Sequence, residues 1–206
     1  MMDGPAAGAP EPAPTGEVTR EELHRRSIDL RGFRRSDGLF EVEARLTDRK
    51  THDFAPLSGG RHVAAGDTIH DHGLRVVFGA DMVIREISTD MRASPYRECL
   101  GGGDTLQAMV GVRIGPGWNG ELRKRLPAGD TCTHLKEMMI PLASAAFQLI
   151  YSVRTSNVIE VNAEGRPRKI DSCYAYGASR ELVALQWPAF HRPAAAQDTK
   201  DDQGNA

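Results

Sequence analysis

The sequence predicts an α+β protein, in which an antiparallel sheet built from two hairpins is followed by packed helices. Apolar and polar residues alternate in stretches between residues 27 and 88, and tight-turn signals separate these stretches. From residue 104 onward, apolar residues recur at helical spacing instead. Sequential hairpins favour an antiparallel sheet, and helices that come after the strands favour the α+β class.

The first hairpin is expected from residues 27–35 and 40–46, joined by a turn at 36–38 that ends in Gly38. A charged lead-in over residues 21–26 is expected to be helical. The return strand is the clearest in the chain, because its apolar residues alternate strictly with charged ones. The residues expected to face the core are Phe40, Val42, Ala44 and Leu46. Residues 47–66 hold several Gly and Pro and are expected to form a loop.

A second hairpin is expected over residues 68–88, with its turn at 79–81. Helical spacing then predicts helices over 104–112, over 118–126 and, as the longest, over 132–153. Pro141 lies inside the longest helix and is expected to kink or split it. Residues 170–176 are expected to be a short strand, and residues 179–187 a helix or a strand.

Composition excludes some classes of function. The 206 residues include 26 Lys and Arg and 28 Asp and Glu, and this balance of charge excludes a globally basic nucleic-acid binder. The basic run at 123–125 has no aromatic residues beside it on which bases could stack, so we expect no nucleic-acid partner. No segment resembles a signal peptide or a membrane span. Three cysteines suit a reducing compartment, and we expect a cytoplasmic protein.

The two ends of the chain are poor in apolar side chains. Residues 1–19 and 193–206 hold too few of them for burial to compensate for the conformational entropy lost on ordering, so disordered tails are expected there. One domain is expected between them, over residues 20–192. The sequence leaves its oligomeric state open.

Several short motifs lie between residues 26 and 192: RGFRRSDGL at 31–39, AGDTIHD at 65–71, VRIGPGW at 112–118, CTHL at 132–135, AAFQ at 145–148 and IDSC at 170–173. Taken together, they resemble a bacterial family known only as domain of unknown function 2889. This resemblance implies no activity. His72 departs from the family pattern, which more often has an apolar residue there, so the resemblance assigns His72 no role.

A second resemblance concerns organisation. The order of elements looks like that of the NifU-like iron–sulfur scaffold and sulfur-acceptor fold. Antiparallel strands come first, Cys99 follows the last hairpin, and Cys132 lies at the start of a helix. This resemblance implies cysteines gathered at one end of the sheet. It is an analogy of fold, and fold alone argues little about function.

The cysteines give the first candidate site. Thiolates of Cys99, Cys132 and Cys173 together with the imidazole of His134 would suit Zn²⁺ or an iron–sulfur species. Their spacing lacks a close cysteine pair, and the alternative is that all three cysteines are small buried hydrophobic residues. A further alternative is a lone reactive thiol at Cys132, because a helix N-terminus lowers a thiol pKa.

His70, Asp71 and His72 give the second candidate site. Two residues apart on a strand, the imidazoles of His70 and His72 project to one face, where they could share a metal ion or flank a ligand. Asp71 projects to the other face. The alternative is a pair of structural or surface histidines. We take His70, Asp71 and Cys132 as candidate catalytic residues, with His70 as the proton-transfer group.

These observations favour an enzyme of the lyase or hydrolase type that acts on a small molecule. A metal ion, Zn or Fe, would polarise an oxygen of the substrate. No glycine-rich phosphate loop is present, since the Gly115–Gly117 turn lacks the required spacing, and we expect no nucleotide cofactor. The alternatives are a non-catalytic iron–sulfur or sulfur-carrying assembly protein, and a ligand-binding accessory protein.

Overall fold

The structure, a computed structural model, describes residues 17–153 and 160–193. The chain divides into two compact units, Met1–Val153 and Arg154–Ala206. The single domain expected over residues 20–192 stays a prediction. Most of the two expected tails, residues 1–16 and 194–206, lies outside the described residues.

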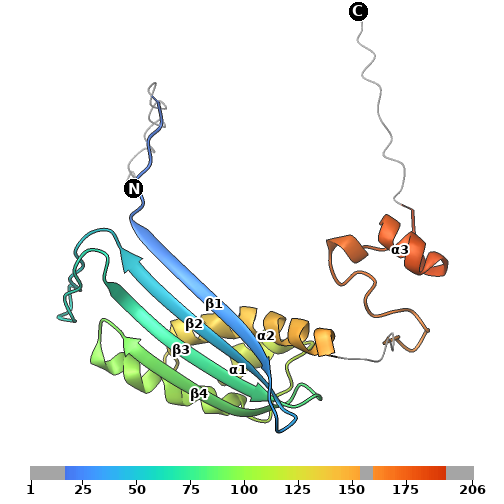
Figure 1. Cartoon of the computed structure of the whole chain (residues 1–206), viewed down its shortest axis with the longest axis horizontal. Helices are drawn as coiled ribbons and strands as arrows, with labels where there is room; N and C mark the ends of the chain where they lie inside the picture. The colour runs from blue at the N-terminus through green and yellow to red at the C-terminus, as the bar shows by residue number, and fades with distance from the viewer. Residues whose placement is uncertain (1–16, 154–159, 194–206) are drawn as a thin grey trace, which may run out of the picture. The chain divides into compact units, whose positions relative to one another are not determined.

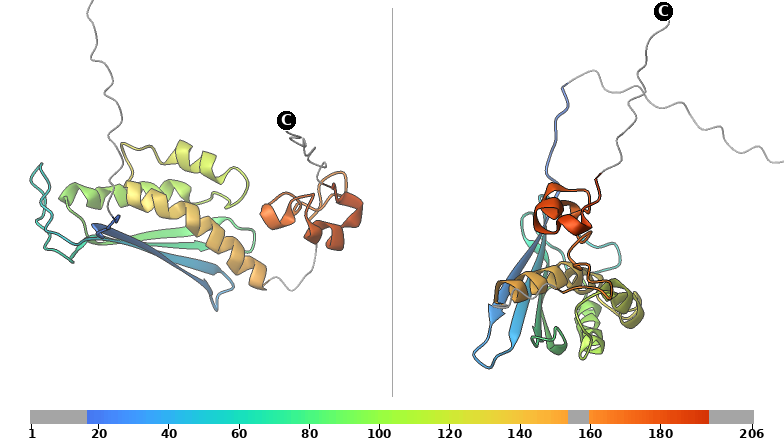
Figure 2. Two further views of the ribbon diagram at one scale, coloured as in Figure 1. Left: turned by 90° about the horizontal axis from the view of Figure 1, so that it is seen from above. Right: turned by 90° about the vertical axis from the view of Figure 1, so that its right-hand side faces the viewer.

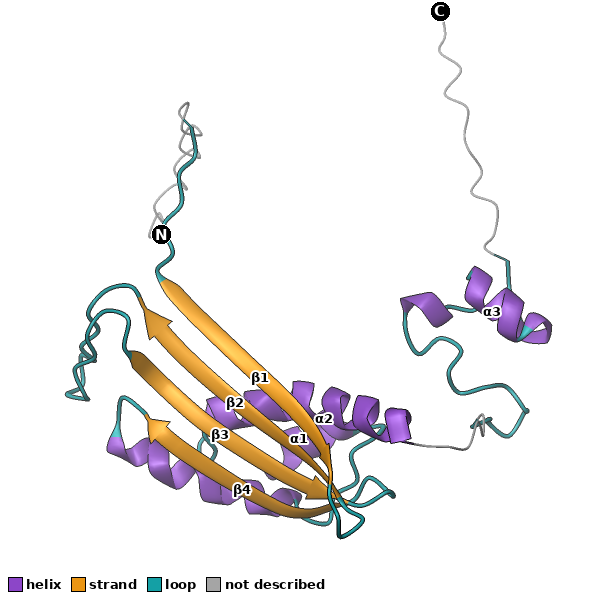
Figure 3. Cartoon of the chain, viewed as in Figure 1, coloured by secondary structure: helices purple, strands orange, loops and turns teal. Residues whose placement is uncertain are grey.

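The first unit is built on a four-stranded antiparallel sheet in the order β1-β2-β3-β4, so every strand pairs with its neighbour in sequence (Figure 1). The strands are β1 His24–Arg34, β2 Phe40–Lys50, β3 Thr68–Phe78 and β4 Ile84–Ala93. Helices follow the strands along the chain (Figure 3) and lie on one face of the sheet (Figure 2). This arrangement confirms the predicted α+β class and the two hairpins.

The first hairpin closes as its turn signal predicts. Gly38 has a φ of 84°, which side chains disfavour, and the N–H of Arg35 donates to the carbonyl of Leu39 at 2.9 Å. The strands are longer than the sequence suggests. β1 begins at His24, so the helical lead-in at 21–26 is wrong, and β2 runs on to Lys50, into the stretch expected to be a loop.

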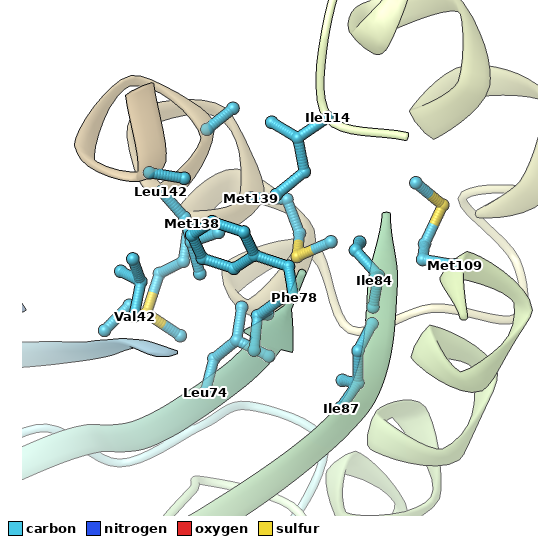
Figure 4. Close-up of a cluster of buried hydrophobic side chains, with 14 of the residues drawn as sticks. Val42, Leu74, Phe78, Ile84, Ile87, Met109, Ile114, Met138, Met139 and Leu142 are labelled. Atoms are coloured by element: carbon cyan, nitrogen blue, oxygen red, sulfur yellow. The ribbon is translucent and has the colours of Figure 1, made fainter. Parts of the chain in front are cut away.

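The inner face of the sheet is apolar over most of its length. The four residues of β2 expected in the core, Phe40, Val42, Ala44 and Leu46, are all buried. Equivalent positions of β3 and β4 carry further apolar side chains, and Figure 4 shows Val42, Leu74, Phe78 and Ile84 packed toward Met139 and Leu142 of the covering helix. Burial of this surface is the main favourable term in folding of the first unit.

The covering layer consists of η1 Arg97–Met109, a 3₁₀ helix, α1 Trp118–Arg125 and α2 Thr133–Val153. The apolar stripe of α2 faces the sheet, and the helix runs unbroken through Pro141, so the predicted alternative of a split there is wrong. Trp118 of α1 donates its indole N–H to the carbonyl of Met139 at 2.9 Å, which joins α1 to α2.

The second unit contains η2 Tyr174–Tyr176, α3 Glu181–Gln186 and η3 Pro188–Phe190. The strand expected over 170–176 is wrong, because that stretch forms turns and η2, whereas the helical alternative for 179–187 is confirmed by α3. Among the described residues of both units, no helix combines the length and apolar character that crossing a bilayer requires.

A polar cluster between the sheet and the start of α2

The inner face of the sheet becomes polar at one end. The pairing register places Arg26 of β1 opposite Asp48 of β2, and Asp48 opposite His70 of β3. Asp48 is two residues beyond Leu46, so strand alternation turns it toward the helices, where its side chain is 2% exposed. Three polar side chains from three strands therefore lie in one row on the face that elsewhere forms the core.

Asp48 is the hub of this row. Arg26 donates two hydrogen bonds to it, from Nε to Oδ1 and from Nη2 to Oδ2, each 2.8 Å long. His70 donates from Nδ1 to Oδ2 at 2.9 Å, and His24 donates from Nε2 to Oδ1 at 3.0 Å. Both carboxylate oxygens are thus fully engaged. Since Nδ1 of His70 is the donor, Nε2 of the neutral ring carries the free lone pair.

The first turns of α2 cover the row. The ring of His134 lies against that of His70, tilted by 36° with 4.0 Å between ring centroids, and its Nε2 lies 3.9 Å from Oδ2 of Asp48. Glu137, one turn further along α2, accepts a hydrogen bond of 2.7 Å from Nη1 of Arg26. The start of the helix therefore completes a cluster whose other members come from three strands.

Cys132 immediately precedes α2 and lies between two imidazoles. Its Sγ is 3.8 Å from Nδ1 of His72 and 3.9 Å from Nδ1 of His134. The backbone N–H of Cys132 donates to the carbonyl of Gly102 at 3.0 Å, and a Cβ on Gly102 would come within 2.8 Å of that nitrogen. A glycine in η1 thus permits the close approach that fixes where α2 begins.

Burial and pairing set the charges of the cluster. Burial opposes ionisation of Asp48, but the hydrogen bonds and positive charge of Arg26, with the hydrogen bonds of His70 and His24, outweigh it and lower the pKa of Asp48 to about 2. Burial lowers the pKa of His72 to about 4 and also lowers the pKa values of His70 and His134. At neutral pH Asp48 is therefore an anion, and these three imidazoles are neutral.

The cluster contains a set of atoms that could hold a metal ion. Asp48, His70 and His134 each offer one ligand atom, and the three atoms lie within 4.8 Å of one another. A carboxylate and two neutral imidazoles suit borderline divalent ions such as Zn²⁺ and Fe²⁺, and three protein ligands leave a position open for water or substrate. The side chain of His134 is 22% exposed and that of His70 is 16% exposed, so solvent reaches the site.

The structure arranges the sequence-predicted residues differently from the expected cysteine site. It brings together His70, His72, Cys132 and His134 at the sheet end that α2 covers. Cys99 lies in η1 outside the metal-capable group, and Cys173 is exposed and belongs to the second unit. Asp71 projects to the outer face, where Arg45 pairs with it at 2.5 Å.

Asp48 and Arg26 were not among the sequence-predicted site residues. The signal that would have found Asp48 is the alternation of β2, because extending the inward set of Phe40 to Leu46 by one step places a carboxylate on the core face. Arg26 required the pairing register of β1 with β2. His72, to which the resemblance assigned no role, is fully buried beside Cys132.

Comparison with known proteins places the chain in a family without an assigned activity. No curated protein and no solved structure matches the chain, so the NifU-like organisation stays a prediction. The family model of a protein of unknown function (DUF2889) matches residues 24–148. The matched segment runs from the first residue of β1 into α2 and contains every residue of the cluster. The chain belongs to this family of proteins of unknown function, DUF2889.

Proposed function

We propose that this protein is a small-molecule enzyme of the hydrolase or lyase type, in which Asp48, His70 and His134 hold a divalent metal ion, Zn²⁺ or Fe²⁺. The observation that carries the proposal is the convergence of one carboxylate and two imidazoles, from β2, β3 and α2, within 4.8 Å. The bound ion would polarise an oxygen of the substrate or activate a water molecule.

The surroundings of the three ligands support this chemistry. Metal ions bind neutral imidazoles and ionised carboxylates, and those are the forms that the cluster favours at neutral pH. Cys132 contacts Nδ1 of His134 and so orients a ring whose Nε2 faces Asp48. Neighbours that fix the ring of a metal-bound histidine are a regular part of metal sites.

An iron–sulfur or sulfur-carrying assembly protein remains the alternative function. That function needs several thiolates around one cluster, whereas the ligand atoms that converge here are nitrogen and oxygen. A ligand-binding accessory protein would use the same cluster to bind a ligand without chemistry. The donor set therefore favours the metal-assisted enzyme.

The test is a metal titration of the untagged full chain. Protein stripped with a chelator should bind one Zn²⁺ per chain in isothermal titration calorimetry. His134→Ala and His70→Ala should each weaken binding more than about 100-fold, because each removes a ligand. His62→Ala is the matched control: it removes an imidazole that is 63% exposed and lies 3.8 Å from Asp53, outside the cluster.

Activity is then measured on the metal-loaded protein with a panel of small esters, amides and hydroxy acids. Turnover that requires metal and is lost in folded His134→Ala supports the proposal. Wild-type protein that contains no stoichiometric metal after aerobic or anaerobic purification, and that binds Zn²⁺ no better than His134→Ala does, would overturn it. A visible absorption band of an iron–sulfur cluster would instead favour the assembly protein.

A further inference from the structure

The proposed metal ion must change the contacts that Arg26 makes in the cluster. Its guanidinium lies against Asp48 as a two-pronged fork, and its remaining terminal nitrogen donates to Glu137. The side chain is 33% exposed, so solvent reaches part of it. Such a fork matches the two oxygens of any carboxylate, whether it belongs to a protein residue or to a ligand.

A metal ion and Arg26 compete for the same acceptor. Oδ2 of Asp48 accepts from Arg26 and from His70, and Oδ1 accepts from Arg26 and from His24. An ion bound to Asp48 needs at least one of these lone pairs. It also places a second positive charge within a few ångströms of the guanidinium, which repels it. Metal binding therefore weakens the pair between Arg26 and Asp48.

Glu137 keeps the displaced guanidinium at the site. Its carboxylate, on α2, is 46% exposed and holds Nη1 of Arg26 at 2.7 Å independently of Asp48. When Asp48 turns to the metal, Nε and Nη2 of Arg26 lose their acceptor while Nη1 keeps its own. The two freed donors then lie beside the metal position, on a side chain that is 33% exposed.

The charge of the cluster changes sign at the same step. Without metal, the single positive charge of Arg26 faces the two negative charges of Asp48 and Glu137. A divalent ion converts this net charge of minus one into plus one. A site with one net positive charge and a free guanidinium fork complements a singly charged anion with two oxygens.

We infer that the substrate is a small organic carboxylate, which Arg26 binds through its fork once the metal ion has taken Asp48. This inference rests on the proposed metal site and deepens it by naming the substrate class. Arg26 then has two states, a partner of Asp48 in the metal-free protein and an anchor for the substrate in the metal-loaded protein.

The experiment measures metal and anion binding in the full chain. Zn²⁺ affinity is measured by calorimetry. Anion binding is measured on protein loaded with Co²⁺ in place of Zn²⁺, because the visible spectrum of bound Co²⁺ changes when its coordination changes. Acetate is the carboxylate probe and inorganic phosphate is the comparison. The variants are Arg26→Ala and Arg26→Lys, and the control is Arg25→Ala, which removes a guanidinium that is 67% exposed and pairs with Glu22.

The expected result separates the two roles of Arg26. Arg26→Ala should bind Zn²⁺ at least 3-fold more tightly than wild type, because a competing cation is gone. The same variant should bind acetate about 10-fold more weakly, equivalent to about 1.4 kcal/mol. Arg26→Lys retains the charge but loses the fork, so it should bind Zn²⁺ as wild type does and still bind acetate more weakly. Arg25→Ala should match wild type in both measurements.

Three outcomes would overturn the inference. Unchanged acetate affinity in both Arg26 variants would show that Arg26 does not bind the carboxylate. Weaker Zn²⁺ binding in folded Arg26→Ala would show that Arg26 does not compete with the metal ion for Asp48. Tighter binding of phosphate than of acetate by wild type would exclude the carboxylate class. If Arg26→Ala does not fold, the acetate affinity of Arg26→Lys tests the inference instead. Failure of wild type to bind Zn²⁺ would overturn the proposed function as well, and that result is distinct from the other three.

Discussion

The two ends of the inner sheet face share one strand geometry but carry different chemistry. At one end, Val42 and Phe78 are fully buried against α2 in an apolar core. At the other end, the same alternation turns Asp48 inward, into a row with Arg26 and His70. The backbone thus presents both sets of side chains in the same way, and only residue type distinguishes core from cluster.

The difference also separates stability from function. Apolar burial stabilises the fold in proportion to the area removed from water, about 25 cal/mol per Å². The desolvation cost of a buried ion pair is about as large as the attraction between its charges. Apolar residues of similar volume can therefore often replace such a pair without loss of stability. Apolar burial therefore accounts for the stability of the apolar end, and the polar end is the part of the sheet for which we propose chemistry.

The largest expected effect comes from a substitution at the apolar end. Val42→Asp would place an unpaired carboxylate in the core and should lower the free energy of unfolding by more than about 4 kcal/mol. Urea denaturation followed by circular dichroism measures this loss. Glu43→Gln, on the outer face of the same strand, is the control and should change stability by less than about 0.5 kcal/mol. Wild-type stability of Val42→Asp would show that the register of β2 is wrong.

The next effect concerns the charge at the polar end of the metal-free protein. The folded-state pKa of Asp48 is about 2, below its ordinary value of 3.8. A carboxyl group with a depressed pKa contributes stability above its unfolded-state pKa and loses that contribution as the pH falls through the folded value. We expect the free energy of unfolding to fall by about 2 kcal/mol between about pH 5 and pH 1 on account of Asp48.

Two variants check that assignment by denaturant unfolding at each pH. Asp48→Asn should remove the part of the acid limb that Asp48 causes, about 2 kcal/mol, whatever its stability at neutral pH. The part that remains belongs to the buried imidazoles, because burial lowers the pKa of His72 to about 4 and also lowers the pKa values of His70 and His134. Asp29→Asn, which changes an exposed carboxylate paired with Arg31 on β1, should leave the limb unchanged. An acid limb of undiminished size in Asp48→Asn would mean that Asp48 does not contribute to it.

A smaller effect tests how the polar end is held in place. Gly102→Ala would put a Cβ about 2.8 Å from the backbone nitrogen of Cys132. It should cost about 1–3 kcal/mol of stability and also weaken Zn²⁺ binding, because the start of α2 must shift. Gly101→Ala is a matched control, since a Cβ there meets nothing within 4 Å. Equal behaviour of the two variants would contradict the close contact of η1 with the start of α2.

The smallest expected effect separates a thiolate ligand from an orienting thiol. Cys132→Ser should cost about 1 kcal/mol of stability and weaken Zn²⁺ binding less than 10-fold, because Sγ contacts ring nitrogens but lies outside the metal-capable group. Cys99→Ser is the control and should bind Zn²⁺ as wild type does. A loss as large as that in His134→Ala would make Cys132 a ligand.

Much of the fold could be predicted from local patterns. Alternation in β2, the glycine turn at Gly38 and the apolar stripe of α2 each depend on residues close in sequence, so they appear in the chain directly. The elements that were wrong lie where local patterns are weak. The charged residues around His24 suited a helix as well as an edge strand, and only pairing with β2 makes them a strand.

The site was predictable only in part. His70 and His72 were placed on one face by strand period, and Cys132 and His134 by their position at the start of a helix. The two pairs are at least sixty residues apart, and nothing in the sequence relates the end of β3 to the start of α2. Cysteine chemistry favoured a thiolate site, whereas packing gathered imidazoles around a carboxylate that the sequence had suggested was in a loop.

By itself, the sequence determined the class of fold, the order of hairpins and helices, and which side chains of β2 face inward, because residue type and spacing set these locally. Only the tertiary structure decided that Arg26, Asp48 and His70 share one row and that His134 closes over it. Strand register and the crossing of α2 over the sheet result from many distant contacts acting together. A site assembled from three strands and a helix exists only once those contacts have formed.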